Sequence, residues 1–209
     1  TYEIQFGNVE RETTNNYSWD TAKFEACGHK WADLSENSSG VSLLNDCKYG
    51  YSIKKGDMSL TLIKSGTYPN EDADIGEHRF TYSIYPHAGR WQEAKTVEMA
   101  YNLNVPMPVK RIGKQKGCGE EYDSFLHCDK ESCFIEVIKK AEDGDGVIVR
   151  MYENKNNRVR AHITSGRALV HVYECNLLEE KEAELTVCGT TFETVFKPYE
   201  IKTFRLIFA

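Results

Sequence analysis

A short polar run carries the side chains of this sequence that are best suited to chemistry. The run 45–49 (NDCKY) follows the apolar stretch 40–44, so it begins where a predicted strand ends. Asp46 supplies an acceptor, Lys48 a donor and Tyr49 a flat ring, a combination that suits sugar hydroxyls or the bracing of a neighbouring domain. A salt-bridged end of a β-sandwich explains the same residues equally well, and both interpretations stay open.

Two other groups of reactive residues have simpler explanations. The acidic loop 71–74 (EDAD) lacks the full ligand set of a calcium loop, and we interpret it as solvated. Cys118, Cys128 and Cys133 lie near His127 in the sequence, but no Cys-x-x-Cys spacing occurs. We therefore expect structural thiols and no metal at these cysteines.

Composition excludes several classes of protein. The chain has 209 residues and a net charge of −6, which argues against nucleic-acid binding, since that calls for clustered Lys and Arg. The basic run 110–116 is short, and we interpret it as a solvated linker. No apolar run approaches the roughly 20 residues that span a bilayer. The seven cysteines show no disulfide rhythm, which favours reduced thiols and a cytoplasmic location.

The elements that must position these residues read mainly as strands. We predict a strand over 1–11, with Tyr2, Ile4 and Phe6 on one face. This strand has no preceding leader pattern and looks already under way, so we expect the chain to be a fragment that has lost an N-terminal partner.

Two alternating stretches flank the acidic loop. In 58–63 the apolar side chains recur at period two, and in 80–85 they do so again. We predict two adjacent antiparallel strands here, with Phe80, Tyr82 and Ile84 sharing a face.

The period then changes. Apolar residues near helical spacing predict a short helix over 91–103, and prolines at 106 and 108 end it. From 132 onward the pattern is again β, with an Asp-Gly hairpin turn over 141–146. The predicted strands are 133–138, 147–152, 159–163, 168–174, 184–187 and 200–208. Short strands with regular turns are typical of a small β-sandwich.

Several long stretches resemble one known family. They are FEACGHKWADLSE, GVSLLNDCKYGY, SGTYPNEDADIGEHRFTYSIYPHAG, YNLN, YECNLLEE and FKPYEIKTFRL, in that order. They are similar to the C-terminal β-region of the glycoside hydrolase family 38 α-mannosidases, most closely the cytosolic and bacterial type. The similarity extends over nearly the whole chain.

This resemblance implies an activity and a missing part. The family consists of retaining enzymes that hydrolyse terminal α-mannosidic linkages, and a zinc ion grips the sugar hydroxyls. The resemblance implies that the zinc ligands and the catalytic carboxylates lie in an N-terminal catalytic domain, and none of those motifs can be matched in this sequence. The chain alone should thus hold no catalytic residue and no metal, and should be inactive.

The resemblance also gives the candidate residues a role. Loops of this region reach the catalytic barrel in the family, so we take Asp46, Lys48, Tyr49 and His78 as substrate-proximal candidates. The implied partners are the missing N-terminal catalytic domain and a mannose-containing oligosaccharide, with no nucleic acid and no membrane, and a homo-oligomer stays open.

We predict an all-β chain in three parts. Residues 1–90 form the end of a large β-sandwich, 91–130 a helix and linker, and 131–209 a small C-terminal β-sandwich. One rival interpretation is a stand-alone carbohydrate-binding module, which needs an exposed platform such as Trp19, Trp31 or Trp91. Another is an oligomerisation module, which an exposed apolar patch on 200–208 would favour.

Overall fold

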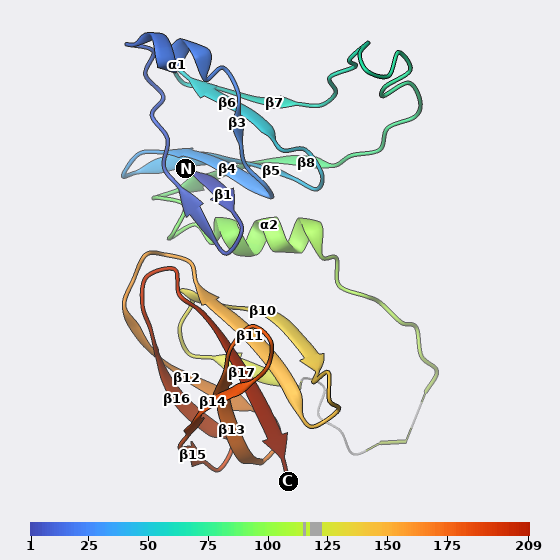
Figure 1. The fold of residues 1–209 in the computed structure, drawn as a ribbon, viewed down its shortest axis with the longest axis vertical. Helices are drawn as coiled ribbons and strands as arrows, with labels where there is room; N and C mark the ends of the chain where they lie inside the picture. The colour runs from blue at the N-terminus through green and yellow to red at the C-terminus, as the bar shows by residue number, and fades with distance from the viewer. Residues whose placement is uncertain (115, 118–122) are drawn as a thin grey trace. The chain divides into compact units, whose positions relative to one another are not determined.

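A computed structural model describes residues 1–114, 116–117 and 123–209 (Figure 1). The chain divides into two compact units, unit 1 (Thr1–Arg111) and unit 2 (Ile112–Ala209). Strands dominate both units, which confirms the predicted all-β class. The boundary falls inside the stretch 91–130, which we predicted as helix and linker, and places the helix in unit 1. Neither helix among the residues described is long and apolar enough to cross a bilayer.

Unit 1 contains two antiparallel sheets and two helices. The larger sheet has the order β2-β1-β4-β5-β8, and the smaller has the order β3-β6-β7. The elements are β1 (Tyr2–Ile4), β2 (Gly7–Val9), α1 (Ser18–Ala22), β3 (Ala26–Cys27), β4 (Trp31–Ser35), β5 (Ser39–Asn45), β6 (Gly50–Lys54), β7 (Asp57–Thr61), β8 (Tyr82–Ala88) and α2 (Thr96–Asn104).

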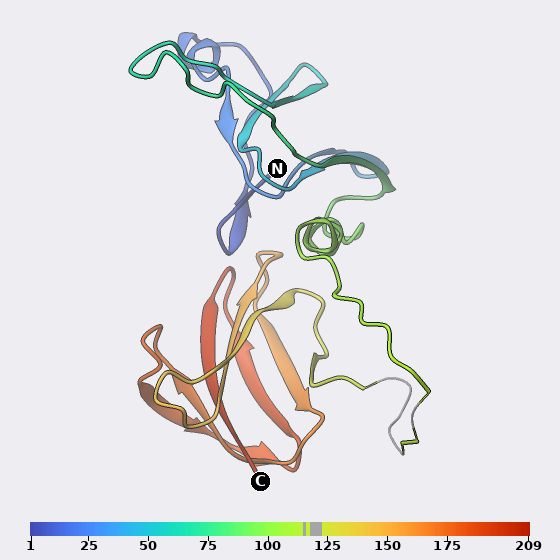
Figure 2. The ribbon, with the colours of Figure 1, turned by 90° about the vertical axis from the view of Figure 1, so that its right-hand side faces the viewer.

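The larger sheet packs on both of its faces. On one face, Tyr2 and Ala32 join Tyr51 and Ile53 of the smaller sheet in a buried apolar cluster. On the other face, Trp31 lies 5.1 Å from Trp91, ring centre to ring centre. Helix α2 lies against β4 and β5 on this side, and Figure 2 shows it almost end on.

The single strand predicted over 1–11 is wrong. β1 and β2 form a hairpin, in which Ile4 pairs with Gly7 and Tyr2 with Val9. Phe6 sits in the two-residue turn with φ of 55°, a left-handed conformation that few side chains favour. Alternating residues on either side of a tight turn read as one continuous strand when the turn lacks Gly, Pro, Asn or Asp.

Both strands around the acidic loop are confirmed, but their predicted pairing is wrong. β7 pairs with β6, whereas β8 pairs with β5, so the two lie in different sheets. Period-two alternation identifies a face and carries no information on the partner strand. The face of β8 that carries Tyr82 and Ile84 is exposed, while Tyr85 donates its hydroxyl hydrogen bond to the carbonyl of Ala94 on the helix side.

The predicted helix is confirmed with a later start. α2 begins at Thr96 because Lys95 before it is left-handed, with φ of 57°. It ends at Asn104, two residues ahead of the first proline, as the steric effect of proline predicts.

Unit 2 is a sandwich of two antiparallel sheets that face each other (Figure 2). Their orders are β10-β11-β17-β13-β14 and β15-β16-β12-β9. The strands are β9 (Leu126–Cys128), β10 (Cys133–Lys140), β11 (Val147–Glu153), β12 (Val159–Ser165), β13 (Leu169–Cys175), β14 (Lys181–Leu185), β15 (Val187–Cys188), β16 (Thr191–Phe196) and β17 (Ile201–Phe208).

The sequence prediction of unit 2 is largely confirmed, with three differences. The Asp-Gly hairpin joins β10 to β11 as predicted. The strand predicted over 184–187 is divided at Thr186, since β14 belongs to one sheet and β15 to the other. β9 and β16 were not predicted. β17 is a central strand with Phe204 and Leu206 fully buried, and Ile201, at 37%, is its one exposed large apolar side chain, so it gives little support to the oligomerisation interpretation.

Candidate functional site

The turn that carries Asp46, Lys48 and Tyr49 is held by one buried residue, Asn45. Its amide nitrogen donates to the carbonyl of His29 at 2.9 Å. Its side-chain oxygen accepts the backbone N–H groups of Cys47 at 3.1 Å and Lys48 at 2.5 Å. Such an Asx turn fixes the backbone just after the strand. The sequence analysis did not predict that Asn45 fixes this turn. An Asn at the end of a strand is a typical first residue of an Asx turn, so the signal was present in the sequence.

Asp46 joins the turn to Thr81, the residue just before strand β8. Its backbone N–H donates to the carbonyl of Thr81 at 3.1 Å, and its carboxylate accepts the N–H of Thr81 at 2.9 Å. This backbone hydrogen bond lowers the pKa of the Asp46 carboxyl group below its usual value. Asp46 is therefore an exposed anion at neutral pH.

Lys48 and Tyr49 place a cation and a ring beside this anion. The ammonium nitrogen of Lys48 lies 4.9 Å from the centre of the Phe80 ring, within the range of a cation–π contact. The ring of Tyr49 is 57% exposed and lies 5.3 Å from that of His29. We call Asp46, Lys48 and Tyr49 the rim.

His78 makes its contact elsewhere. Its Nε2 atom lies 2.8 Å from the carbonyl oxygen of Asp74, within its own exposed loop. The structure brings three of the four predicted residues together on one turn, and it places the fourth with a local partner.

Comparison with known proteins then identifies the chain. The model of the glycosyl hydrolases family 38 C-terminal domain matches residues 1–72, and that of the family 38 C-terminal beta sandwich domain matches 133–204. The chain belongs to glycosyl hydrolase family 38. The first match includes the rim, whereas His78 falls between the two matches.

Relatives of this family 38 chain agree with the match. It is 42% identical over 210 residues to Alpha-mannosidase G of Dictyostelium discoideum and 34% identical over 212 residues to Alpha-mannosidase 2C1 of Homo sapiens. Each alignment covers 99% of this chain but only 19% and 20% of the relative. The chain thus spans about a fifth of the length of these curated relatives. An alpha-mannosidase structure from Enterococcus faecalis V583 shares the fold, with a TM-score of 0.78, 18% identity and coverage of 98% of this chain and 24% of that one.

The family 38 chain also contains a serine, an aspartate and a histidine in contact, which the sequence did not suggest. One carboxylate oxygen of Asp33 accepts from Ser42 at 2.7 Å and lies 2.7 Å from Nε2 of His87. The aspartate stands between the other two, which is the wrong order for a nucleophile and its base, and Ser42 is fully buried. Because Ser42 also bonds Thr96 of α2 at 2.9 Å, this set joins the sheet to the helix.

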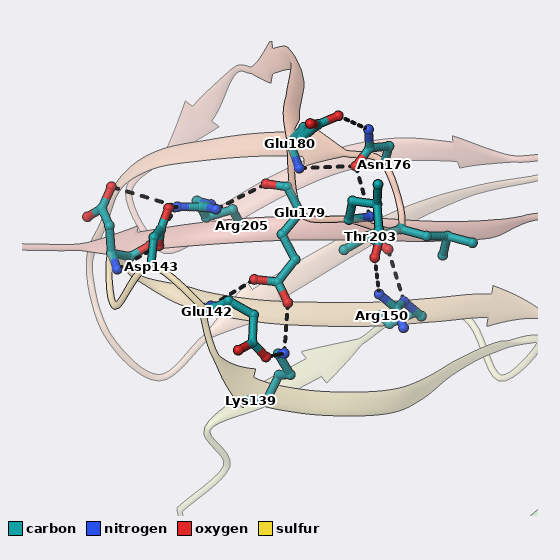
Figure 3. A network of polar contacts seen from close by, with 12 residues as sticks. Lys139, Glu142, Asp143, Arg150, Asn176, Glu179, Glu180, Thr203 and Arg205 are labelled. Atoms are coloured by element: carbon teal, nitrogen blue, oxygen red, sulfur yellow. Dashed lines mark hydrogen bonds and ion pairs between the residues drawn. The ribbon is translucent and has the colours of Figure 1, made fainter.

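A second polar network closes one end of unit 2 (Figure 3). Arg205 donates to the carboxylate of Asp143 at 2.6 Å and to the carbonyl of Glu179 at 3.0 Å. Glu179 in turn accepts the N–H of Glu142 at 2.9 Å and pairs with Lys139 at 2.8 Å. The guanidinium of Arg205 lowers the pKa of Asp143. These contacts join two turns, so the network acts as a structural clasp, although Nε of Arg205 is buried without an acceptor among the described residues.

No metal centre emerges from the cysteines or elsewhere in the described residues. No group of three or more His, Cys, Asp or Glu side chains there is placed to hold a metal ion. Cys128 and Cys133 share a hydrogen bond, which lowers the pKa of Cys128. Cys118 lies outside the described residues.

The three tryptophans proposed as a platform have different environments. Trp31 and Trp91 are 1% and 4% exposed, and they pack under α2. Trp19 is 61% exposed. Only Trp19 could therefore present its ring to a ligand on the surface of unit 1.

Proposed function

We propose that this chain is the C-terminal region of a longer α-mannosidase, a retaining enzyme that hydrolyses terminal α-mannosidic linkages of oligosaccharides. The observation that carries this proposal is 34–42% identity to α-mannosidases along 99% of the chain. The chain itself supports the catalytic domain, and its rim contributes to the wall of the substrate cleft.

The rim suits this role by its chemistry. An ionised Asp46 accepts sugar hydroxyls, Lys48 donates to them, and the exposed ring of Tyr49 offers an apolar face. All three follow Asn45, whose buried contacts hold the turn in place. The zinc ion expected for the family has no fitting set of ligands in the described residues, so we derive no step through it for this chain.

Activity assays of two proteins test this proposal. The full-length protein should release α-mannose, the retained anomer, from an aryl α-mannoside, as anomer-resolved NMR would show. The 209-residue chain should be inactive with or without zinc, since it supplies no matched carboxylate pair. Turnover by the pure chain near ordinary enzyme rates, about 1–10³ per second, would contradict the assignment of catalysis to another domain.

We further propose a cytoplasmic location. Six cysteines in the described residues are free thiols, two of them buried. All seven should react after unfolding when thiols are mapped by mass spectrometry without reductant. Two or more protected pairs would contradict a reducing compartment.

A further inference from the structure

Unit 1 contains a cavity of about 610 Å³ that lies apart from the rim residues. Strand β6 lines one wall through Tyr51, Ser52 and Ile53, and the segment 10–25 lines the other. The volume falls within the roughly 300–1,000 Å³ of small-molecule sites. The cavity is therefore large enough for a ligand of one or two sugar rings.

An aromatic pair stands at this cavity. Tyr17 and Trp19 line it and are 60% and 61% exposed, with ring centres 5.1 Å apart. Both lie at α1, which the carboxylate of Asp20 holds by accepting the backbone N–H groups of Asn16 and Tyr17. Such rings combine a flat apolar face with a polar N–H or O–H, which matches the two sides of a sugar.

The lining also includes a residue with a buried donor that is unpaired among the described residues, Arg11. The guanidinium carbon of Arg11 lies 4.6 Å above the ring centre of Tyr2, and both residues line the cavity. The Nη1 atom of Arg11 is buried and has no acceptor among the described protein atoms. Because an unpaired buried donor is unfavourable, an oxygen of a ligand would stabilise it.

The charges of the lining favour a neutral ligand. The cations of Arg11, Lys23 and Lys54 are opposed by the carboxylates of Glu10, Glu12, Asp20 and Glu25, so the two signs nearly balance. Since neither sign dominates, a phosphate or an ammonium group has no preferred place. A molecule that is rich in hydroxyl groups can both donate and accept here.

We propose that this cavity binds a neutral carbohydrate, with a sugar ring against Tyr17 and Trp19 and a sugar oxygen accepting from Arg11. The assignment of a carbohydrate rests on the cavity, and the choice of an α-linked mannose disaccharide as its ligand rests on the proposed function. This site is separate from the rim, so it adds a second contact with a glycan.

Quenching of tryptophan fluorescence by acrylamide tests the proposal on the 209-residue chain. Trp31 and Trp91 are buried, so Trp19 supplies the accessible signal. An α-linked mannobiose should protect Trp19 from the quencher in a saturable way, whereas lactose should protect it much less.

Variants separate binding from folding. Arg11→Gln should weaken the protection at least about tenfold in ligand concentration, as expected for the loss of a charged hydrogen bond. Tyr17→Ala keeps the reporter and should weaken binding as well. Arg79→Gln is the matched control, because the Arg79 side chain is 88% exposed and outside the cavity lining. The ligand concentration that it needs for protection should stay within about twofold of the unchanged chain's.

Protection that persists in both Arg11→Gln and Tyr17→Ala, or no protection by either sugar, would overturn the proposal. Either result would leave the activity assay of the full-length protein untouched. Equal protection by lactose would support a carbohydrate site and overturn the choice of mannose.

Discussion

The two units use their sheets in different ways. In unit 2 two sheets close on one apolar core, where Phe204 lies 5.2 Å from Phe192 and 6.3 Å from Phe196, ring centre to ring centre. In unit 1 the larger sheet buries polar Asp33 and Ser42 against a helix, and the unit leaves an open cavity and exposed rings. On this basis we propose that unit 2 is a scaffold and that unit 1 carries the groups that recognise a ligand.

One local device occurs in both units and makes the contrast sharper. Asp46 in unit 1 and Asp129 in unit 2 each donate a backbone N–H to one residue distant in the sequence and accept that residue's N–H with a carboxylate oxygen. The partner is Thr81, just before β8, for Asp46 and His162 on β12 for Asp129. The carboxylate of Asp129 is also paired with Lys130 at 2.8 Å and lies 3.1 Å from His162. Asp46 is instead exposed and pairs with no cation among the described residues, and Tyr49 follows it on the same turn. The same pair of backbone hydrogen bonds is thus found at a carboxylate with charged partners in unit 2 and at an exposed carboxylate in unit 1.

The largest expected effect is on the core of unit 2. Phe204→Ala should lower the free energy of unfolding of unit 2 by about 3–5 kcal/mol, because it removes a fully buried ring. Hydrogen exchange read by mass spectrometry would locate the loss. Val170→Ala on an exposed position of β13 is the control. A loss below about 1 kcal/mol would mean that this core does not hold the sandwich together.

A smaller effect is expected at the helix side of unit 1. A Cβ atom at Gly40 would lie 2.4 Å from Cβ of Ser35 and 2.5 Å from the His87 ring. Gly40→Ala should therefore destabilise unit 1 by about 1–3 kcal/mol through overpacking. All three tryptophans belong to unit 1, so fluorescence during urea unfolding measures it.

Gly66→Ala is the matched control, since its new atom meets nothing closer than 3.8 Å. Equal midpoints for the two variants would show that His87 and its sheet can move aside. The buried contacts of Asp33 with Ser42 and His87 would then tolerate a change of packing at little cost in stability.

Acid should weaken the clasp of unit 2. The pKa of Asp143 is lowered by Arg205 and that of Glu179 by Lys139. A lowered pKa in the folded state gives stability that is present above the unfolded values, about 3.9 for Asp and 4.3 for Glu, and is lost as the pH falls through the folded values. The unfolding midpoint should be flat above about pH 5 and fall below about pH 4.

Asp143→Asn should make this acid loss shallower, because one of the two carboxyl groups no longer titrates. Thermal unfolding at several pH values in that range, monitored by hydrogen exchange in unit 2, measures how steeply the midpoint falls. An unchanged slope of the midpoint against pH would show that the ion pair between Asp143 and Arg205 does not contribute to the stability of unit 2.

The smallest expected effect concerns the two matched aspartates. Asp46→Ala and Asp129→Ala should each change stability by less than about 1 kcal/mol, since solvent screens exposed contacts of this kind. Urea unfolding of both variants compares them directly. A loss of several kcal/mol in the free energy of unfolding of Asp46→Ala would show that the Asp46 carboxylate has a structural role.

The sequence predicted most strands, and the structure places the three rim residues on one turn, while their role near a substrate stays a prediction. Alternation located β7 and β8 and an apolar run located β5, yet the partner of β8 depends on a chain crossing that local pattern does not encode. The position of the turn after β5 was predictable from the polar run that begins at Asn45. The cavity could not, because it joins segment 10–25 to β6, and their contact depends on the fold of the whole unit. Trp19 was recognised as a candidate platform, but its exposure needed the structure.

The most direct test of the central claim, that unit 1 carries the ligand chemistry, compares the two aspartates by activity. In the full-length enzyme, kcat/KM on an aryl α-mannoside should fall about a hundredfold for Asp46→Ala, as small misplacements near a cleft can cost that much. For Asp129→Ala it should stay within about twofold, because the substitution lies in the scaffold. Equal values for the two variants, or a larger loss for Asp129→Ala, would contradict the division of roles between the units.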